Sequence, residues 1–355
     1  MPSAARVIIK LICFLVASLL FVSLLSFGIF MYLNGPPEIP HDTINDSGIR
    51  MEGEDVLILE VRAGESALSV GKRLEEAGII RSHFLWQFIS RLEKDYIKSG
   101  NYRIELPASQ LEIHSILVSG IQILVRVTIP EGVTIRKAAL ILEETGICNA
   151  EDFMNIASAP ELLNYYHIPG KTLEGYLYPD TYLFPLSFPP EKVVRTLADT
   201  FYDRISEIAP EALTMGYEDL NQKIIIASIV EREYRIPEEA SLMAGVFYNR
   251  LKIGMALQSC ATVEYVITEI QGRPHPEFLY NRDLEIRDPY NTYIRAGLPP
   301  GPISSPGEIA LRAAFFPVSS DYLYFRLVDT DTGKHYFSRT LDDHIQAGTL
   351  YLKGY

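Results

Sequence analysis

The chain has 355 residues, of which 48% are hydrophobic and 22% are charged. This balance excludes a wholly disordered protein, and the length exceeds that of one ordinary small domain. The formal net charge of −13 argues against a nucleic-acid partner, because an acidic surface repels phosphate backbones. Three cysteines cannot build a disulfide framework. Cys13 lies in an apolar run, and we expect Cys148 and Cys260 to be unpaired thiols rather than a single bridge.

The first feature in chain order is an apolar segment, Leu11–Leu33, without a charged residue. As a helix of about 34 Å it can cross a bilayer. Arg6 and Lys10 precede it, and acidic residues follow it. The positive-inside rule therefore predicts a single-pass protein of the cytoplasmic (inner) membrane, with residues 1–10 in the cytoplasm and the rest outside, in the periplasm.

A cleaved signal peptide is the alternative for this segment. Its apolar stretch would usually be shorter, and Leu33-Asn-Gly-Pro36 is a poor cleavage context. We therefore interpret residues 11–33 as a retained transmembrane helix. Residues 34–54, which are polar and rich in Pro, Gly and Asp, are predicted to form a linker.

An internal repeat follows. Gly64–Ile79 and Gly132–Ile147 align, and each copy comes after an alternating segment, at Val56–Val61 and Leu124–Ile129, that predicts a strand. Each copy then has a hydroxyl residue suited to cap a helix, a leucine on the apolar stripe and a glycine at the end. These positions are Ser66, Leu74 and Gly78 in the first copy, and Thr134, Leu142 and Gly146 in the second.

A second short helix is predicted to begin near Ser82 and near Asn149, so each copy reads as strand, helix, helix. Two copies are too few for a solenoid. The pattern resembles the small LysM-like α+β fold that binds glycan in wall proteins, and a spacer that binds nothing is the alternative. We assign residues 55–130 to this module and residues 131–355 to a second domain.

The C-terminal half carries the candidate chemistry. Lys192–Ile208 is predicted to be an amphipathic helix, and Lys223–Arg235 an almost wholly apolar one. Glu231 shares a face with apolar residues of that second helix. Desolvation raises the pKa of such a carboxyl group, as a general acid requires, although a buried ion pair is the alternative. Glu233, with Arg232 and Arg235, is expected to face solvent.

Further elements are predicted from turn and cap signals. A helix should begin at Pro237 and stop at Gly254, and Thr262 should cap the next one. Asp288–Pro302 is a rigid loop whose Tyr290, Asn291 and Tyr293 suit either sugar binding or covering of the core.

The C-terminal residues predict two helices around a hairpin. Ser305 and Glu308 match a capping box, and Thr340 with Asp343 repeats that pattern at the last helix. Between them, Asp321–Val328 and Lys334–Phe337 are predicted to pair. Three histidines of this half show no metal-ligand spacing: His275, His335 and His344.

Five sequence motifs lie in order between residues 173 and 344. The first is the helix Ile226-Ala-Ser-Ile-Val-Glu-Arg-Glu233. The others are Leu173–Tyr182, Phe247–Leu251 with Leu257–Ser259, Pro289–Tyr293 with Gly297–Gly301, and Tyr322–Phe325 with His335, Phe337 and His344. Together these five motifs resemble those of the YceG-like family of endolytic peptidoglycan lytic transglycosylases. The resemblance implies an α+β fold: a transmembrane helix, the LysM-like module, and a mainly helical catalytic domain with a C-terminal hairpin.

The resemblance further implies that Glu231 is the catalytic acid/base of a lyase. The reaction would cleave the MurNAc–GlcNAc β-1,4 bond without water, leave 1,6-anhydroMurNAc ends and terminate strand elongation. No metal or cofactor is expected. Expected partners are glycan strands, the membrane, wall polymerases and divisome or elongation proteins, and not nucleic acid. Candidate substrate-binding residues are Glu174, Tyr178, Gln258, Ser259, Tyr290, Asn291, Tyr293 and His335.

One departure and two alternatives remain open. After Leu257-Gln-Ser259 the family commonly has Asp-Pro, whereas this chain has Cys260-Ala261, so Cys260 becomes a candidate groove-lining thiol. A non-catalytic wall-binding scaffold is one alternative. A hydrolytic muramidase is the other, and it would need a second carboxylate to activate water, for which the candidates are Glu174, Asp180 and Glu264.

Overall fold

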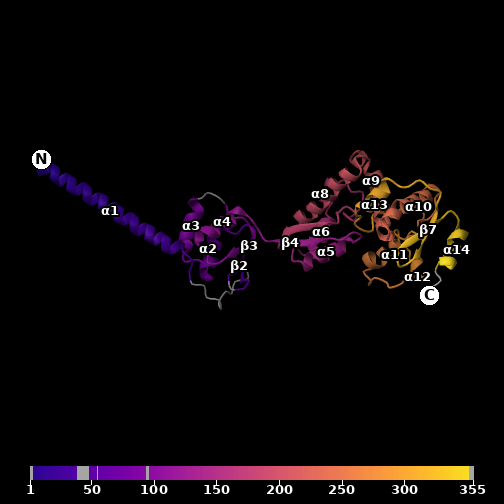
Figure 1. Cartoon of the computed structure of the whole chain (residues 1–355), viewed down its shortest axis with the longest axis horizontal. Coiled ribbons are helices and arrows are strands. Elements are labelled where there is room, and N and C mark those ends of the chain that lie inside the picture. Colours follow the sequence, from indigo (N-terminus) through magenta and orange to yellow (C-terminus); the bar gives the residue numbers. More distant parts are fainter. Residues whose placement is uncertain (1–2, 38–47, 54, 93–95, 352–355) are drawn as a thin grey trace. The chain divides into compact units, whose positions relative to one another are not determined.

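The computed structural model describes residues 3–37, 48–53, 55–92 and 96–351, so most of the predicted linker at 34–54 lies outside the described residues. The chain has a mixed α/β fold with small sheets and forms two compact units (Figure 1). Unit 1 comprises residues 1–124 and 185–187, and unit 2 comprises residues 125–184 and 188–355.

The predicted apolar helix is α1 (Ser3–Asn34). Its segment Val7–Asn34 is long and apolar enough to cross a membrane, and none of its most apolar stretch is buried against the rest of the protein. The apolar helix predicted from the sequence is therefore confirmed.

Unit 1 is built around an antiparallel sheet with the order β1-β2-β3. In its centre, Leu59 of β2 lies opposite Ile49 and Tyr102. Helices cover the sheet, and Trp86 is fully buried in the core between them. The elements of this unit are β1 (Ile49–Met51), β2 (Val56–Val61), α2 (Ala67–Glu76), α3 (His83–Leu92), β3 (Gly100–Glu105) and α4 (Gln110–Ser119).

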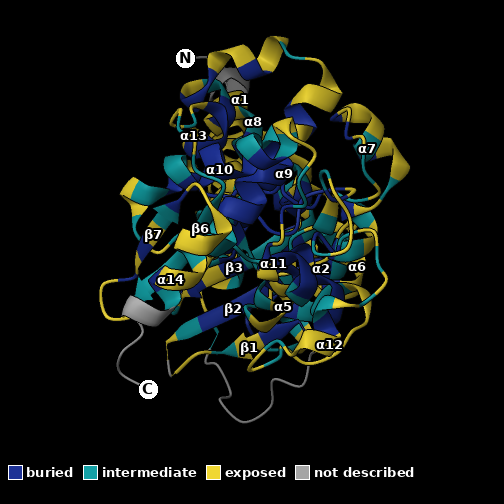
Figure 2. Ribbon diagram, turned by 90° about the vertical axis from the view of Figure 1, so that its right-hand side faces the viewer, coloured by how far each residue is buried: buried dark blue, intermediate teal, exposed yellow. Residues whose placement is uncertain are grey.

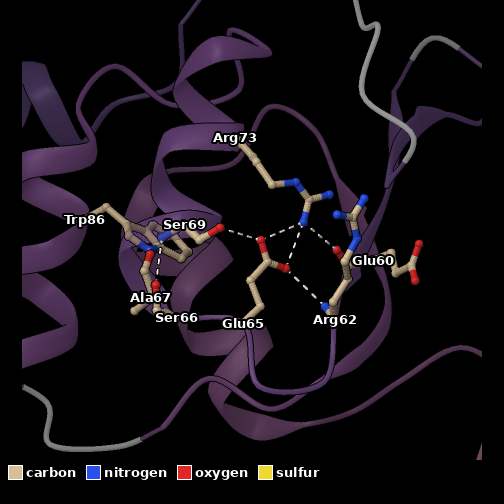
Figure 3. Close-up of polar contacts among 8 residues, drawn as sticks. All are labelled: Glu60, Arg62, Glu65, Ser66, Ala67, Ser69, Arg73 and Trp86. Atoms are coloured by element: carbon tan, nitrogen blue, oxygen red, sulfur yellow. Dashed lines mark hydrogen bonds and ion pairs between the residues drawn. The ribbon is translucent and has the colours of Figure 1, made fainter.

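A partly buried ion pair fixes the turn between β2 and α2 (Figure 3). Glu65 accepts from the Arg73 guanidinium at 2.9 Å, from the Ser69 hydroxyl at 2.9 Å and from the Arg62 backbone N–H at 3.1 Å. The Trp86 indole donates to the Ala67 carbonyl at 2.8 Å. Two of these bonds join a side chain to the backbone, at Arg62 and at Ala67, and the other two join side chains to one another, so together they hold the start of α2 in one position.

Unit 2 is mainly helical. Two pairs of strands complete it, β4 with β5 and β6 with β7. Its elements are β4 (Leu124–Thr128), α5 (Ile135–Glu144), α6 (Ala150–Ala157), α7 (Pro160–Tyr165), β5 (Thr181–Pro185), α8 (Pro190–Ile208), α9 (Tyr217–Glu233), α10 (Ala240–Lys252), α11 (Cys260–Tyr265), α12 (Asn281–Leu284), α13 (Glu308–Phe315), β6 (Tyr324–Asp329), β7 (Lys334–Ser338) and α14 (Leu341–Tyr351).

Both copies of the repeat fold as strand, helix, helix, as predicted: β2-α2-α3 and β4-α5-α6. Ser66 and Thr134 are N-caps whose side chains accept a backbone N–H from the first turn. Gly78 and Gly146 have φ of +70° and +72°, the left-handed conformation that glycine adopts most readily. Leu74 and Leu142 are fully buried.

Helix α9 forms the centre of unit 2. It begins six residues before the predicted start, and residues 224–230 are buried in succession, so its middle has no solvent face (Figure 2). Helix α13 packs along it. The Ser228 hydroxyl accepts from the Ile303 N–H at 3.0 Å, and the Ser228 carbonyl accepts from the Ser304 hydroxyl at 3.0 Å.

Two cap predictions are wrong. Helix α13 begins at Glu308 after Gly307, and no side-chain bond links Ser305 to Glu308 across that start. Thr262 lies buried inside α11 and donates to the Ser259 carbonyl at 2.7 Å, while Ser259 occupies the N-cap position. The Thr262 hydroxyl also lies 2.9 Å from that of Thr292, and the Glu308 carboxylate accepts from Arg312 at 2.8 Å, so neither side chain caps the start of its own helix.

The remaining C-terminal predictions are confirmed. β6 and β7 form the hairpin, and Thr340 accepts the Asp343 N–H at 3.2 Å at the start of α14. Helix α10 follows a single 3₁₀ turn at Pro237–Glu239. The loop from Asp288 to Pro302 contains no helix or strand, apart from one isolated bridge between Ala256 and Ala296.

Candidate active site

A cavity of about 510 Å³ lies where the C-terminal end of α9 meets α11 and the hairpin β6–β7. Glu233, the last residue of α9, lines it and is mostly buried. Its carboxylate accepts a hydrogen bond from the Ser259 hydroxyl. The prediction that Glu233 faces solvent is therefore wrong, because α11 and the hairpin cover this side of the helix.

Burial raises the pKa of Glu233, and the nearby Glu264 carboxylate acts in the same direction. The Ser259 hydroxyl and Arg232 oppose that shift. The position at the helix C-terminus also disfavours negative charge, because the last backbone carbonyls point there. Glu233 is thus a carboxyl group that holds its proton more tightly than an exposed one, inside a cavity large enough for a ligand.

The other groups around Glu233 are largely cationic or aromatic. Arg232 forms an ion pair with Glu264 at 2.9 Å. Arg250 links two segments of the cavity wall, because its guanidinium donates to the carbonyl of Leu323 before β6 and to that of Leu257 before α11, both at 2.6 Å. Further lining residues include Arg235, Cys260, Tyr324, Arg326 and His344.

Glu231 lies on another side of α9 and does not line this cavity. Its Oε2 accepts the backbone N–H of Gly307 at 2.8 Å, and the Tyr234 hydroxyl donates to its Oε1 at 3.4 Å. Gly307 is the N-cap residue of α13, so Glu231 supplies the cap that the local sequence does not. Burial and the Glu131 carboxylate raise the pKa of Glu231 to about 7, although the Gly307 N–H opposes this shift.

Glu131, whose carboxylate helps to raise the pKa of Glu231, is not singled out by any pattern in the sequence. It precedes Gly132, whose N–H donates to the Ser305 carbonyl at 2.8 Å, while the Ser305 N–H donates to the Val133 carbonyl at 2.8 Å. A Cβ on Gly307 would stand 2.6 Å from the Glu131 side chain, so glycine is needed there for the two segments to approach. This contact crosses more than 170 positions of sequence, and no local pattern signals it.

Four of the predicted substrate-binding residues lie in or beside the cavity. Gln258, Tyr293 and His335 line it, and Ser259 bonds to Glu233. Gln258 has a φ of +51°, which the bond from its N–H to the Thr292 carbonyl at 3.0 Å holds. The Nδ1 atom of His335 lies 2.8 Å from the Glu239 carboxylate, which orients the ring.

The other four predicted residues lie elsewhere. Glu174 is buried and accepts the Ile135 N–H at the start of α5 at 3.2 Å, and burial raises its pKa to about 8. Asn291 is fully buried and donates to the carbonyls of Leu284 and Ile286. Tyr290 packs on Tyr265, and Tyr178 is buried below Arg204. Their observed contacts are structural.

The three residues proposed as a second carboxylate, Glu174, Asp180 and Glu264, lie in different parts of the structure. Glu264 lines the cavity, where it pairs with Arg232 and lies 3.4 Å from His275. Asp180 pairs with Arg204 at 3.5 Å and, like Glu174, is outside the cavity. Glu264 is therefore the one member of that set in a position to assist Glu233.

All three cysteines are unpaired thiols, as expected. Cys260 lines the cavity, with its Sγ 3.1 Å from the Tyr293 hydroxyl, and burial raises its pKa. Within the described ranges, no group of three or more His, Cys, Asp or Glu side chains is placed to hold a metal ion.

A profile of the YceG-like family matches residues 59–349 of the chain. The chain belongs to the YceG-like family. Two relatives from Streptococcus pneumoniae, strains D39 and R6, are 28% identical over 93% of this chain and are named endolytic murein transglycosylase. A Bacillus subtilis protein of the same name is 28% identical over 86% of this chain and 87% of its own length.

The chain spans 64% of the length of each Streptococcus pneumoniae relative. A crystal structure of a YceG-like protein from Listeria monocytogenes aligns with 83% of the chain and 99% of its own chain. Its TM-score is 0.55 at 30% sequence identity. The YceG-like profile includes both the repeat and the cavity that Glu233 lines.

Proposed function

We propose that this YceG-like chain is an endolytic peptidoglycan lytic transglycosylase, a lyase that uses Glu233 as its acid/base. The observation that carries the proposal is a carboxyl group at the end of α9 whose pKa is raised by burial and which lines a cavity of about 510 Å³. The names of the relatives support the substrate and the reaction class.

The proposed reaction needs one carboxyl group. Protonated Glu233 donates its proton to the glycosidic oxygen between MurNAc and GlcNAc as the C1–O bond breaks. The resulting carboxylate then takes the proton of the MurNAc C6 hydroxyl, whose oxygen bonds to C1. Because that nucleophile belongs to the sugar, no water is consumed, and the product ends in 1,6-anhydroMurNAc. Cuts of this kind within nascent strands would terminate their elongation.

Glu231 remains the competing assignment for the acid/base, since the family resemblance implied it. Its raised pKa suits an acid. Its contacts favour a structural role, because Oε2 already caps α13 and the side chain does not line the cavity. We therefore place the chemistry at Glu233 and the helix cap at Glu231.

Sugar contacts are proposed for the residues that surround Glu233. The Tyr293 ring offers an aromatic face, and the exposed Gln258 amide offers both a donor and an acceptor. His335 would contribute Nε2, since Nδ1 is engaged by Glu239. Ser259 acts through its bond to Glu233 rather than on the sugar.

Membrane attachment is part of the proposal. Helix α1 would cross the cytoplasmic membrane once, with Arg6 and Lys10 on the cytoplasmic side and the catalytic domain (131–355) outside. Substrate would then be strands close to that membrane, and wall polymerases and division or elongation proteins would be neighbours. The module at 55–130 would be LysM-like and would contact glycan.

A hydrolytic muramidase is the second candidate, because Glu264 lines the same cavity as Glu233. Its carboxylate pairs with Arg232 at 2.9 Å, and an inverting glycosidase needs a second carboxylate of this kind as its base. A non-catalytic scaffold is the third. A scaffold has no need of a carboxyl group with a raised pKa in a cavity, so the surroundings of Glu233 disfavour this candidate.

The test is the mass of the products released from glycan strands by the full chain in detergent micelles. We expect anhydro-ended products, one water lighter than reducing-ended ones. Reducing ends would identify the muramidase, and intact strands would identify the scaffold. Glu233→Gln, matched with Glu231→Gln as the control variant, assigns the acid in the same assay.

A further inference from the structure

Unit 2 contains a second cavity, of about 400 Å³, formed by α7, α8 and the segment that leads into α9. It shares no lining residue with the cavity at Glu233. Five of its lining residues are tyrosines: Tyr165, Tyr166, Tyr176, Tyr202 and Tyr217. We refer to it as the tyrosine pocket.

The rings of the tyrosine pocket are held in place. Tyr166 lies parallel to Tyr202, with ring centroids 5.5 Å apart and 6° between the planes. His167 stacks on Tyr217 at 4.3 Å, from a backbone with φ of +55°. Tyr165 and Tyr217 are more than half exposed. The pocket therefore presents aromatic faces on fixed supports and at an open rim.

Its polar groups are mainly hydrogen-bond acceptors. Three tyrosine hydroxyls are already donating: Tyr166 to Asp199 at 2.6 Å, Tyr176 to Asn221 at 2.9 Å, and Tyr202 to the Tyr166 carbonyl at 2.9 Å. Asp203 lies one helical turn after Asp199 on α8 and also lines the pocket. The lining residues include two carboxylates and neither lysine nor arginine, and at the rim the Arg195 guanidinium lies 5.1 Å over the Tyr165 ring.

These features call for a ligand that brings positive charge and hydrogen-bond donors. A neutral N-acetyl sugar fits less well, because its acetamide carbonyl would need hydrogen-bond donors from the pocket. Three of the five tyrosine hydroxyls already donate to other groups of the protein. An alkylammonium group fits better, because its methylene groups pack on aromatic faces, its charge is attracted to the π-systems, and its N–H groups meet carboxylates.

We propose that the tyrosine pocket binds a primary alkylammonium group, with the carbon chain on the tyrosine rings and the nitrogen at Asp199 and Asp203. The source to which we commit is the side-chain amine of a diamino acid in a peptidoglycan stem peptide. That part of the proposal rests on the proposed function. The pocket would then bind the peptides of a strand while Glu233 acts on its sugars.

Isothermal titration calorimetry on the full chain in detergent micelles tests this binding. The probe is Nα-acetyl-lysine amide, and the neutral control is the same compound acetylated on its side-chain amine. We expect the charged probe to bind at least about tenfold more tightly and to weaken as salt is added. Equal binding of the two compounds, or saturation by a GlcNAc oligosaccharide in their place, would overturn the proposal.

Matched variants locate the site. Asp203→Asn keeps the size of an exposed side chain and removes its charge, so we expect about fivefold weaker binding. Glu207→Gln removes a charge one turn further along α8, outside the pocket, and should leave the affinity within twofold. Equal effects of the two substitutions would show that general surface charge, not the pocket, holds the amine.

A stem tripeptide that ends in a diamino acid is compared with an unrelated tripeptide that ends in lysine. Tighter binding of the stem peptide supports the committed source, and equal binding overturns that source. No bond is cleaved in these titrations. Glu233→Gln should bind the probe like the wild type. A negative titration would therefore overturn the proposal for the tyrosine pocket, whereas a negative cleavage assay would overturn the proposed function.

Discussion

Two glutamates near the end of α9 have opposite surroundings. Residues two apart on an α-helix point about 200° apart, so Glu231 and Glu233 meet different neighbours. Glu231 caps α13 beside Glu131, and Glu233 borders an open cavity beside Ser259. Burial raises the pKa of both. A raised pKa therefore does not by itself identify a catalytic carboxyl group. Glu233 differs from Glu231 in that it lines a cavity that a ligand could enter.

The largest expected effect comes from Glu233→Gln. The substitution keeps the shape of the side chain and removes the proton donor, so the rate of strand cleavage should fall by about 10²–10⁴-fold. Thermal unfolding should stay close to that of the wild type, because an amide can still accept from Ser259. A variant that folds normally and cleaves at the wild-type rate would place the chemistry elsewhere.

Glu231→Ala should act on stability first. It removes the acceptor of the Gly307 N–H at the start of α13 and leaves a buried donor unsatisfied, which costs about 1–3 kcal/mol. Urea unfolding of the full chain in micelles measures this loss. The folded fraction should still cleave strands, and Glu231→Gln, which restores an acceptor, should recover most of the stability.

The pH dependence of stability sharpens the same comparison. The pKa of Glu231 is raised to about 7 by folding, so the folded state holds the proton more tightly than the unfolded state. Its contribution is complete below about pH 4.5 and is lost as the pH rises through about 7, a change of about 3 kcal/mol. Glu174, with a pKa raised to about 8, adds to this trend.

Unfolding free energies at pH 5 and pH 8, for the wild type and Glu231→Gln, measure the contribution of Glu231. The variant should show the smaller difference between the two pH values. An unchanged difference would mean that Glu231 titrates normally in the folded protein, and that Glu174 or other groups cause the trend.

Among substitutions in the cavity that Glu233 lines, Glu264→Gln is expected to have the smallest effect on the rate of strand cleavage. It breaks the ion pair with Arg232 but leaves the acid in place, so the rate should fall less than about tenfold and the products should remain anhydro-ended. A loss as large as that of Glu233→Gln, together with reducing-ended wild-type products, would favour hydrolysis with Glu264 as the base.

The sequence predicted local structure well where the determinants are local. Ser66 and Thr134 as caps, Gly78 and Gly146 as stops, and the hairpin around residues 329–333 all depend on neighbours in the chain. Both repeat copies therefore fold alike. No pattern in the sequence predicts that β2 joins a three-stranded sheet, whereas β4, among the described residues, forms a two-stranded sheet with β5.

Site residues were predicted less well, because their roles depend on distant partners. The prediction that Glu233 faces solvent requires a polar face on α9, but a helix that is apolar all round is covered on every side. The prediction that Glu174 contacts substrate fails to account for its bond to the Ile135 N–H, which the sequence does not indicate. The capping role of Glu231 needs Gly307, which is 76 positions away.

The most direct test of the account is the pH profile of kcat/KM for strand cleavage. The rate should fall as the pH rises above the raised pKa of the catalytic acid. If that acid is Glu233, the profile of Glu231→Gln should keep the wild-type descending limb, while Glu233→Gln retains only a small, pH-independent rate. A Glu231→Gln enzyme that loses this limb, beside a Glu233→Gln enzyme that keeps it, would contradict the assignment.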